Sequence, residues 1–126
     1  MIEVKSLTKS YNGRKALKGI NFTIQTGELY GLLGPNGAGK TTIISIMSSI
    51  LDADSGEVTI GRYNLSTDAK SVKKVIGVVP QEIALYNELT AYENLLFWGG
   101  LYQVPGKELS NRANELLNLF GLEDRK

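Results

Sequence analysis

The chain has 126 residues, 42% of them hydrophobic and 21% charged, a balance typical of one small globular domain. Its 14 basic and 13 acidic side chains leave a formal net charge of +1, which gives no indication of nucleic-acid binding. The lack of cysteine and histidine excludes disulfides and thiolate chemistry and removes the commonest proton-transfer side chain. No apolar run approaches the ~18 residues of a membrane span, and Glu3 and Lys5 argue against a signal peptide.

The N-terminal part of the chain has the two-residue periodicity of half-buried strands. Ile2 and Val4 alternate with polar residues, and apolar residues return at every second position from 20 to 24. Between these segments, Asn12-Gly13 is a strong turn signal. The pattern predicts antiparallel strands over the first ~28 residues.

Two further segments, residues 29–33 (LYGLL) and 75–79 (VIGVV), are continuously apolar rather than alternating. Such runs are typical of strands that are covered on both faces, as in an α/β sheet. Another strand is expected at residues 57–61 (EVTIG), after a helix stop at residues 52–56.

Helical spacing appears in four places. The first helix is expected after the glycine-rich segment described below, with an apolar stripe formed by Ile43, Ile44, Met47 and Ile50. A second helix is expected over residues 66–75, capped by Ser66 or Thr67.

The other two helices lie in the C-terminal third of the chain. Thr90 and Glu93 have the spacing of a capping box, which predicts a helix that ends near residue 97 or 101. The last helix is expected from about residue 106 to 120 and ends at Gly121, with Leu122 placed for the hydrophobic contact of a helix C-cap.

The segment GLLGPNGAGKTT, residues 31–42, joins a predicted strand to a predicted helix and matches the phosphate-loop pattern. Glycines let the backbone curl closely around phosphate oxygens, and the N-terminus of the following helix favours an anion. Lys40 can reach the β- and γ-phosphates, and the Thr41 hydroxyl can bind Mg²⁺. The predicted nucleotide-binding residues are Gly34, Pro35, Asn36, Gly37, Ala38, Gly39, Lys40, Thr41 and Thr42. The alternative is a glycine-rich turn with no ligand.

Five separated segments resemble the ATP-binding subunits of ABC transporters. They are Tyr11 before the loop, TGELYGLLGPNGAGKTT (residues 26–42), DSGEVTIG (54–61), IGVVPQE (76–82) and LTAYENLLFWGGLY (89–102). The resemblance implies that ATP and Mg²⁺ are the ligands and that Tyr11 stacks on the adenine. It also implies that Gln81 contacts Mg²⁺ and the attacking water, and that Lys40 and Gln81 are catalytic. Alternatively, Tyr11 is a packed aromatic residue and Gln81 is a polar residue at the end of a strand.

The same resemblance implies a fold and partners. The fold class is α/β, a partial P-loop NTPase fold of the ABC type. Residues 1–81 would form an antiparallel β subdomain with the phosphate-loop core, and residues 82–126 the beginning of a helical subdomain. The resemblance is greatest to bacterial drug or sodium exporters, in which ATP hydrolysis drives export through a separate permease. It implies a second ATP-binding subunit and a cytoplasmic location on the inner face of the membrane.

The chain departs from that family in several ways. It lacks the Leu-Ser-Gly-Gly-Gln signature, the strand that ends in Asp-Glu, and the switch histidine. We therefore expect an N-terminal half that binds nucleotide without hydrolysing it. Glu82 is the carboxylate nearest to Gln81, but consecutive residues of an extended segment point in opposite directions. Exposed sheet edges in such a fragment predict low stability or self-association.

Two other classes of protein share a phosphate loop. A small kinase or GTPase is disfavoured, because the guanine motif Asn-Lys-x-Asp is absent and the four arginines do not cluster. A soluble ABC-family ATPase of DNA repair or translation is disfavoured only mildly, by the near-neutral charge and the single-domain length.

Overall fold

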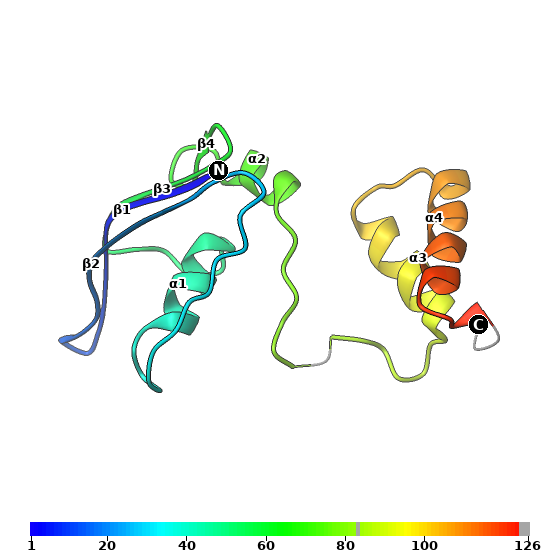
Figure 1. Ribbon diagram of the computed structural model, residues 1–126, viewed down its shortest axis with the longest axis horizontal. Helices are drawn as coiled ribbons and strands as arrows, with labels where there is room; N and C mark the ends of the chain where they lie inside the picture. Colours follow the sequence, from blue (N-terminus) through cyan, green and yellow to red (C-terminus); the bar gives the residue numbers. More distant parts are fainter. Residues whose placement is uncertain (83, 124–126) are drawn as a thin grey trace. The chain divides into compact units, whose positions relative to one another are not determined.

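The computed structural model describes residues 1–82 and 84–123 (Figure 1). The chain divides into two compact units, Met1–Val79 and Pro80–Lys126. Each unit is described by itself. In the described residues, no helix is both long enough and apolar enough to cross a membrane.

The first unit contains a four-stranded antiparallel sheet with the order β2-β1-β3-β4. The strands are β1 (Ile2–Tyr11), β2 (Arg14–Ile24), β3 (Ser55–Ile60) and β4 (Tyr63–Asn64). Asn12 and Gly13 form the turn between β1 and β2 with φ angles of 49° and 79°. A two-residue turn that follows the right-handed twist of its strands requires a positive φ at both residues. The predicted hairpin is therefore confirmed.

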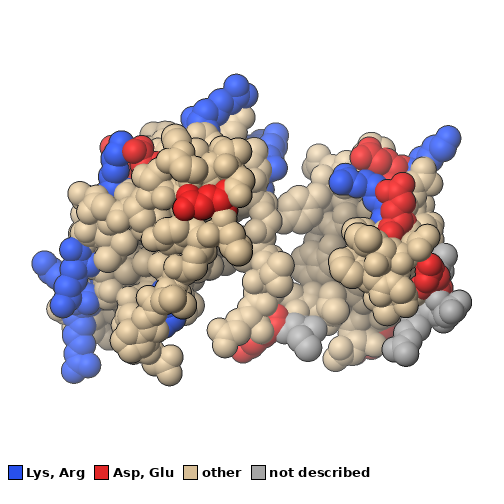
Figure 2. All heavy atoms as spheres, in the orientation of Figure 1, with Lys and Arg blue, Asp and Glu red and all other residues tan. Residues whose placement is uncertain are grey.

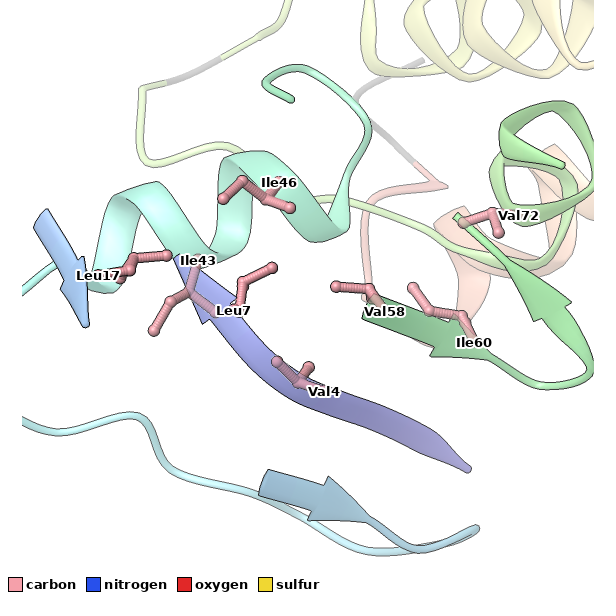
Figure 3. Packing of buried hydrophobic residues seen from close by; sticks show 8 residues of the cluster. All are labelled: Val4, Leu7, Leu17, Ile43, Ile46, Val58, Ile60 and Val72. Carbon is pink, nitrogen blue, oxygen red and sulfur yellow. The ribbon is translucent and has the colours of Figure 1, made fainter. Parts of the chain in front are cut away.

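A short helix packs against this sheet. Helix α1 (Lys40–Met47) contributes Ile43 and Ile46 to a core that also contains side chains of three strands and of α2 (Ala69–Val75). Figure 3 shows these side chains: Val4, Leu7, Leu17, Ile43, Ile46, Val58, Ile60 and Val72. Burial of this apolar surface is the main stabilising contribution to the unit.

Two predicted strands are not formed. Residues 29–33 and 75–79 have no strand pairing in the described residues, and Leu29, Leu33 and Val79 are more than nine-tenths exposed. A continuous apolar run indicates burial on both faces, but a strand also needs a neighbour that accepts its backbone hydrogen bonds. None of the described residues pairs with either segment. The prediction of two buried strands is therefore wrong for this structure.

The helix boundaries also differ from the prediction in two places. Helix α1 ends at Met47, where the Ser48 hydroxyl donates to the carbonyl oxygen of Ile44 at 2.8 Å, so Ile50 lies beyond the helix and is exposed. The cap of α2 is Asp68, whose carboxylate accepts the Ser71 N–H at 3.1 Å. The predicted cap Ser66 instead donates its N–H to the Asn64 side chain at 3.0 Å, because that contact completes the turn after β4.

The second unit contains helices α3 (Ala91–Leu101) and α4 (Gly106–Leu119). The capping box of α3 is confirmed, since Glu93 N–H donates to Thr90 Oγ1 at 3.2 Å and Thr90 N–H donates to Glu93 Oε2 at 2.8 Å. The end of α4 at Gly121 is also confirmed. Gly121 has φ 64°, and Leu122 N–H donates to the Leu117 carbonyl at 2.8 Å.

Asn94 holds the approach to α3 in place. Its side-chain oxygen accepts the Tyr86 N–H at 2.9 Å, and its amide nitrogen donates to the carbonyls of Tyr86, Leu89 and Thr90 at 3.0 to 3.1 Å. With only 6% of its surface exposed, Asn94 is a buried polar residue whose bonds satisfy its polar side-chain atoms.

Candidate functional site

The loop that precedes α1 is shaped by two glycines in the left-handed region. Gly37 and Gly39 have φ angles of 82° and 86°. At Gly39 a Cβ atom would lie 2.6 Å from Leu17 Cδ2 and 2.8 Å from the Ala16 carbonyl oxygen. The loop therefore rests directly on β2, and only glycine fits at that contact.

The N-terminus of α1 opens into this loop. Gly39 is the N-cap residue, and no side chain of the described residues caps the helix. The first N–H groups of an α-helix have no intrahelical partner, and together with the helix dipole they favour an anion. The local geometry is thus that of an anion site.

Lys40 folds back over the loop. Its ammonium group donates to the carbonyl oxygens of Gly34 and Pro35 at 2.6 and 2.8 Å. These bonds hold a positive charge at the place where the loop curls. Thr41, the next residue, is exposed, and Thr42 is half-buried on the first turn of α1.

Tyr11 lies at the end of β1, where 46% of its surface is exposed. It lines an open hollow together with Arg14, Lys15 and the loop residue Gly37. The predicted aromatic residue and the predicted phosphate loop therefore border the same hollow. Figure 2 shows basic side chains at the end of this unit where the β1–β2 hairpin turns.

The ligand chemistry of the hollow fits a nucleotide polyphosphate better than a free metal ion. Within residues 1–82 and 84–123, no group of three or more acidic side chains could hold a metal. The cationic side chains that line the hollow are Arg14 and Lys15. The adjoining loop adds the Lys40 ammonium and the backbone N–H groups of the helix start, and all of these groups bind phosphate. A Mg²⁺ ion would need the Thr41 hydroxyl and oxygens supplied by the phosphates themselves.

A family model described as "ABC transporter" matches residues 17–126. The chain belongs to the ABC transporter family. The match covers α1, its loop and the described helices of the second unit, so the predicted family and fold class are confirmed.

Curated ABC transporter relatives extend over nearly the whole chain. The linearmycin resistance ATP-binding protein LnrL of Bacillus subtilis is 46% identical over 125 residues, which are 99% of this chain and 40% of the relative. The daunorubicin resistance ATP-binding protein DrrA3 of Streptomyces coeruleorubidus is 37% identical, over 98% of this chain and 39% of the relative. The chain therefore spans about 40% of the length of these relatives.

Solved ABC structures have the same fold. The structure of an ATP-binding subunit of an ABC transporter matches with a TM-score of 0.84 and 31% identity, over 99% of this chain and 52% of that one. An ATP-binding cassette, solved as a dimer bound to ADP and Pi after hydrolysis, matches with a TM-score of 0.79 and 33% identity. The matched region covers 99% of this chain and 59% of that cassette.

The structure gives no contact that tests the predicted role of Gln81 in the described residues. Gln81 and Glu82 are the second and third residues of the second unit and are exposed. The role of Gln81 stays a prediction, and Glu82 stays the nearest carboxylate with no predicted role. Sequence reasoning missed Ala16 and Leu17, which support Gly39, and Asp54, whose bonds are described below. The signal available for Asp54 was its place directly before Ser55-Gly56, at the start of β3.

Proposed function

We propose that the chain binds ATP with Mg²⁺ in the hollow between Tyr11 and the phosphate loop. The observation that carries this proposal is the position of the Lys40 ammonium, which is held against the loop by the carbonyls of Gly34 and Pro35. A polyphosphate in the loop would offer that ammonium stronger, charged acceptors than two neutral carbonyls.

Each part of the site has a separate task. The backbone from Gly34 to Gly39 surrounds the phosphates, and the N–H groups at the start of α1, including those of Thr41 and Thr42, donate to them. The Tyr11 ring stacks on the adenine. Bound Mg²⁺ would neutralise charge on the β- and γ-phosphates, with the Thr41 hydroxyl as its ligand from this unit. For Gln81, in the second unit, the family resemblance supports a role in contact with the metal and the attacking water.

In the longer protein, this site would supply one half of an ATPase that drives export. The relatives named above are drug resistance ATP-binding proteins, which supports a role in export through a separate permease subunit, with a second ATP-binding subunit, on the cytoplasmic face of a membrane. The same names disfavour a kinase, a GTPase, or an ATPase of DNA repair or translation. We infer that the 126-residue chain by itself binds ATP without hydrolysing it.

Calorimetric titration of ATP with Mg²⁺ tests the proposal. Lys40→Ala removes a charge-assisted contact and should weaken ATP and tripolyphosphate alike, by ~1.5–3 kcal/mol or roughly ten-fold and more. Tyr11→Ala should weaken ATP by ~1–3 kcal/mol and leave tripolyphosphate unchanged, because tripolyphosphate has no ring to stack on. Lys73→Ala, an exposed lysine on α2, is the control. Equal ATP affinity in the wild type and Lys40→Ala would refute the site.

A further inference from the structure

Asp54 connects the segment after α1 to the end of β1, close to Tyr11. Its carboxylate accepts the Ser10 N–H at 2.7 Å and pairs with the Lys9 ammonium at 3.0 Å. Its own N–H donates to the Thr8 carbonyl at 3.0 Å. One residue thus binds three consecutive residues of β1.

These bonds lie where the pairing of β1 with β3 ends, while its pairing with β2 continues to Tyr11. Among the described residues, the β1–β3 ladder runs no further than Thr8, opposite Ser55, and the hydroxyls of this pair are 2.7 Å apart. The β1–β2 register shifts between Lys9 and Ser10. Beyond Thr8, the side chain of Asp54 therefore takes the place that a longer β3 would occupy and accepts the N–H that such a strand would bind.

Tyr11 follows Ser10 directly, so its Cα lies about 3.8 Å from that of Ser10. A shift of Ser10 moves the backbone that carries the Tyr11 ring, because the planar peptide between the two residues leaves only the ψ of Ser10 and the φ of Tyr11 as soft backbone torsions. The phosphate loop is fixed separately, by the contact of Gly39 with Ala16 and Leu17 on β2. Both walls of the hollow contact β2, because Tyr11 pairs with Arg14 on that strand. Asp54 adds a second support to the Tyr11 wall, from the β3 side of β1.

We propose that Asp54 is a positioning residue that sets the Tyr11 ring over the base position and so determines affinity for the adenosine part of the nucleotide. The proposal rests on the proposed function. The Lys9 side chain, which is 15% exposed, holds the carboxylate in its charged form, and the resulting hydrogen bonds keep the pKa of Asp54 below its ordinary value. Ser10 therefore keeps a charged acceptor throughout the neutral pH range.

Titrations of ATP and tripolyphosphate into Asp54→Ala test this role. Loss of the Ser10 bond leaves the end of β1 held by its pairing with β2 alone. We expect ATP to bind about three- to ten-fold more weakly while tripolyphosphate affinity is unchanged. Glu3→Ala is the matched control, since Glu3 pairs with Lys5 at 2.8 Å near the other end of the same strand and should affect neither ligand. Asp54→Asn, which retains an acceptor for Ser10, should lose less than Asp54→Ala and serves if Asp54→Ala does not fold.

A double-mutant cycle with Tyr11→Ala separates positioning from general destabilisation. If Asp54 acts through Tyr11, Asp54→Ala should not weaken ATP further in the Tyr11→Ala background. Equal losses for ATP and tripolyphosphate, or additive losses in the double variant, would overturn the role of Asp54 while leaving the nucleotide site intact. Failure of the proposed function has a different outcome, in which Lys40→Ala binds both ligands as the wild type does.

Discussion

Gly39 lies so close to Leu17 that a Cβ atom on the glycine would sit 2.6 Å from Leu17 Cδ2. This contact fixes the height of the phosphate loop above β2, because the Ala16 carbonyl closes the same space from the backbone side. The residue that caps α1 is therefore also the residue on which the loop rests.

Gly39→Ala should destabilise the first unit more than Gly37→Ala does. Both substitutions place alanine at φ angles above 80°, which costs about 1–2 kcal/mol. A Cβ at position 37 would meet nothing within 4 Å in the described residues, whereas at position 39 it collides with Leu17 and Ala16. Overpacking of this kind adds about 1–3 kcal/mol. Urea unfolding of both variants measures the difference, and equal losses would contradict the close contact.

The capping box of α3 makes the stability of the second unit depend on pH. Hydrogen bonds from the Thr90 backbone, then from its side chain, lower the pKa of Glu93 from its ordinary value of 4.5. Because the folded-state pKa is the lower one, this stabilisation is present in full above about pH 4.5 and is lost as the pH falls through the lowered value.

Glu93→Gln keeps a side chain suited to a capping box but removes the titration. Thermal melts followed by circular dichroism at about pH 6 and about pH 3 should show a smaller acid-induced loss of helix stability in Glu93→Gln than in the wild type. The control is Glu115→Gln, an exposed carboxylate on α4. An acid-induced loss of the same size in wild type and Glu93→Gln would mean that the box contributes nothing through its charge.

We expect no ATP hydrolysis above background from the 126-residue chain, even with Mg²⁺ and at high protein concentration. Phosphoryl transfer needs several groups that position and stabilise charge together. Among the described residues, we assign the loop backbone, Lys40, Thr41 and Gln81 to that work and no catalytic carboxylate. A phosphate-release assay provides the measurement. Steady release that Lys40→Ala abolishes would show that the chain does hydrolyse ATP and contains a catalytic group not identified above. Glu82→Gln would then identify or exclude the carboxylate nearest to Gln81.

The unpaired apolar segments predict self-association of the chain. Leu33 and Val79 are 93% and 95% exposed on apolar segments that pair with no strand of the described residues. Lysine at either position should shift sedimentation toward the monomer over a concentration series. Ile50→Lys, at a residue 76% exposed outside both segments, should have little effect. A monodisperse wild-type monomer with a cooperative transition at high temperature would count against the prediction.

Three local signals in the sequence predicted the local structure correctly, whereas the predicted cap at Ser66 or Thr67 was wrong. Asn12-Gly13, the Thr90–Glu93 capping box and Gly121 each specify a turn or cap within four residues, and all three have the expected conformation. The segments at 29–33 and 75–79 failed for a different reason. Their pattern reports what a strand would bury, but strand formation depends on neighbours far away in sequence.

In the candidate site too, the local motif could be predicted from the sequence and the long-range contacts could not. The glycines and Lys40 follow one another in a motif, so the loop could be predicted from spacing alone. The support of Gly39 by Leu17 and the bond from Ser10 to Asp54 join residues 22 and 44 positions apart. Such contacts depend on the pairing of β1 with both of its neighbours, which no local pattern reports.

The bonds of Asn94 determine which residues a transplanted copy of the α3–α4 hairpin would have to include. Its side chain binds the backbone of Tyr86 in both directions, so the stretch from Tyr86 to Thr90 is built into α3 although it is not helical. A graft that started at the cap residue Thr90 would leave the buried side-chain oxygen of Asn94 without a partner and its amide nitrogen with the Thr90 carbonyl as its remaining acceptor. A graft that started at Leu85 would include every hydrogen-bond partner of the Asn94 side chain. The first of these partners, Tyr86, lies five residues before the start of α3.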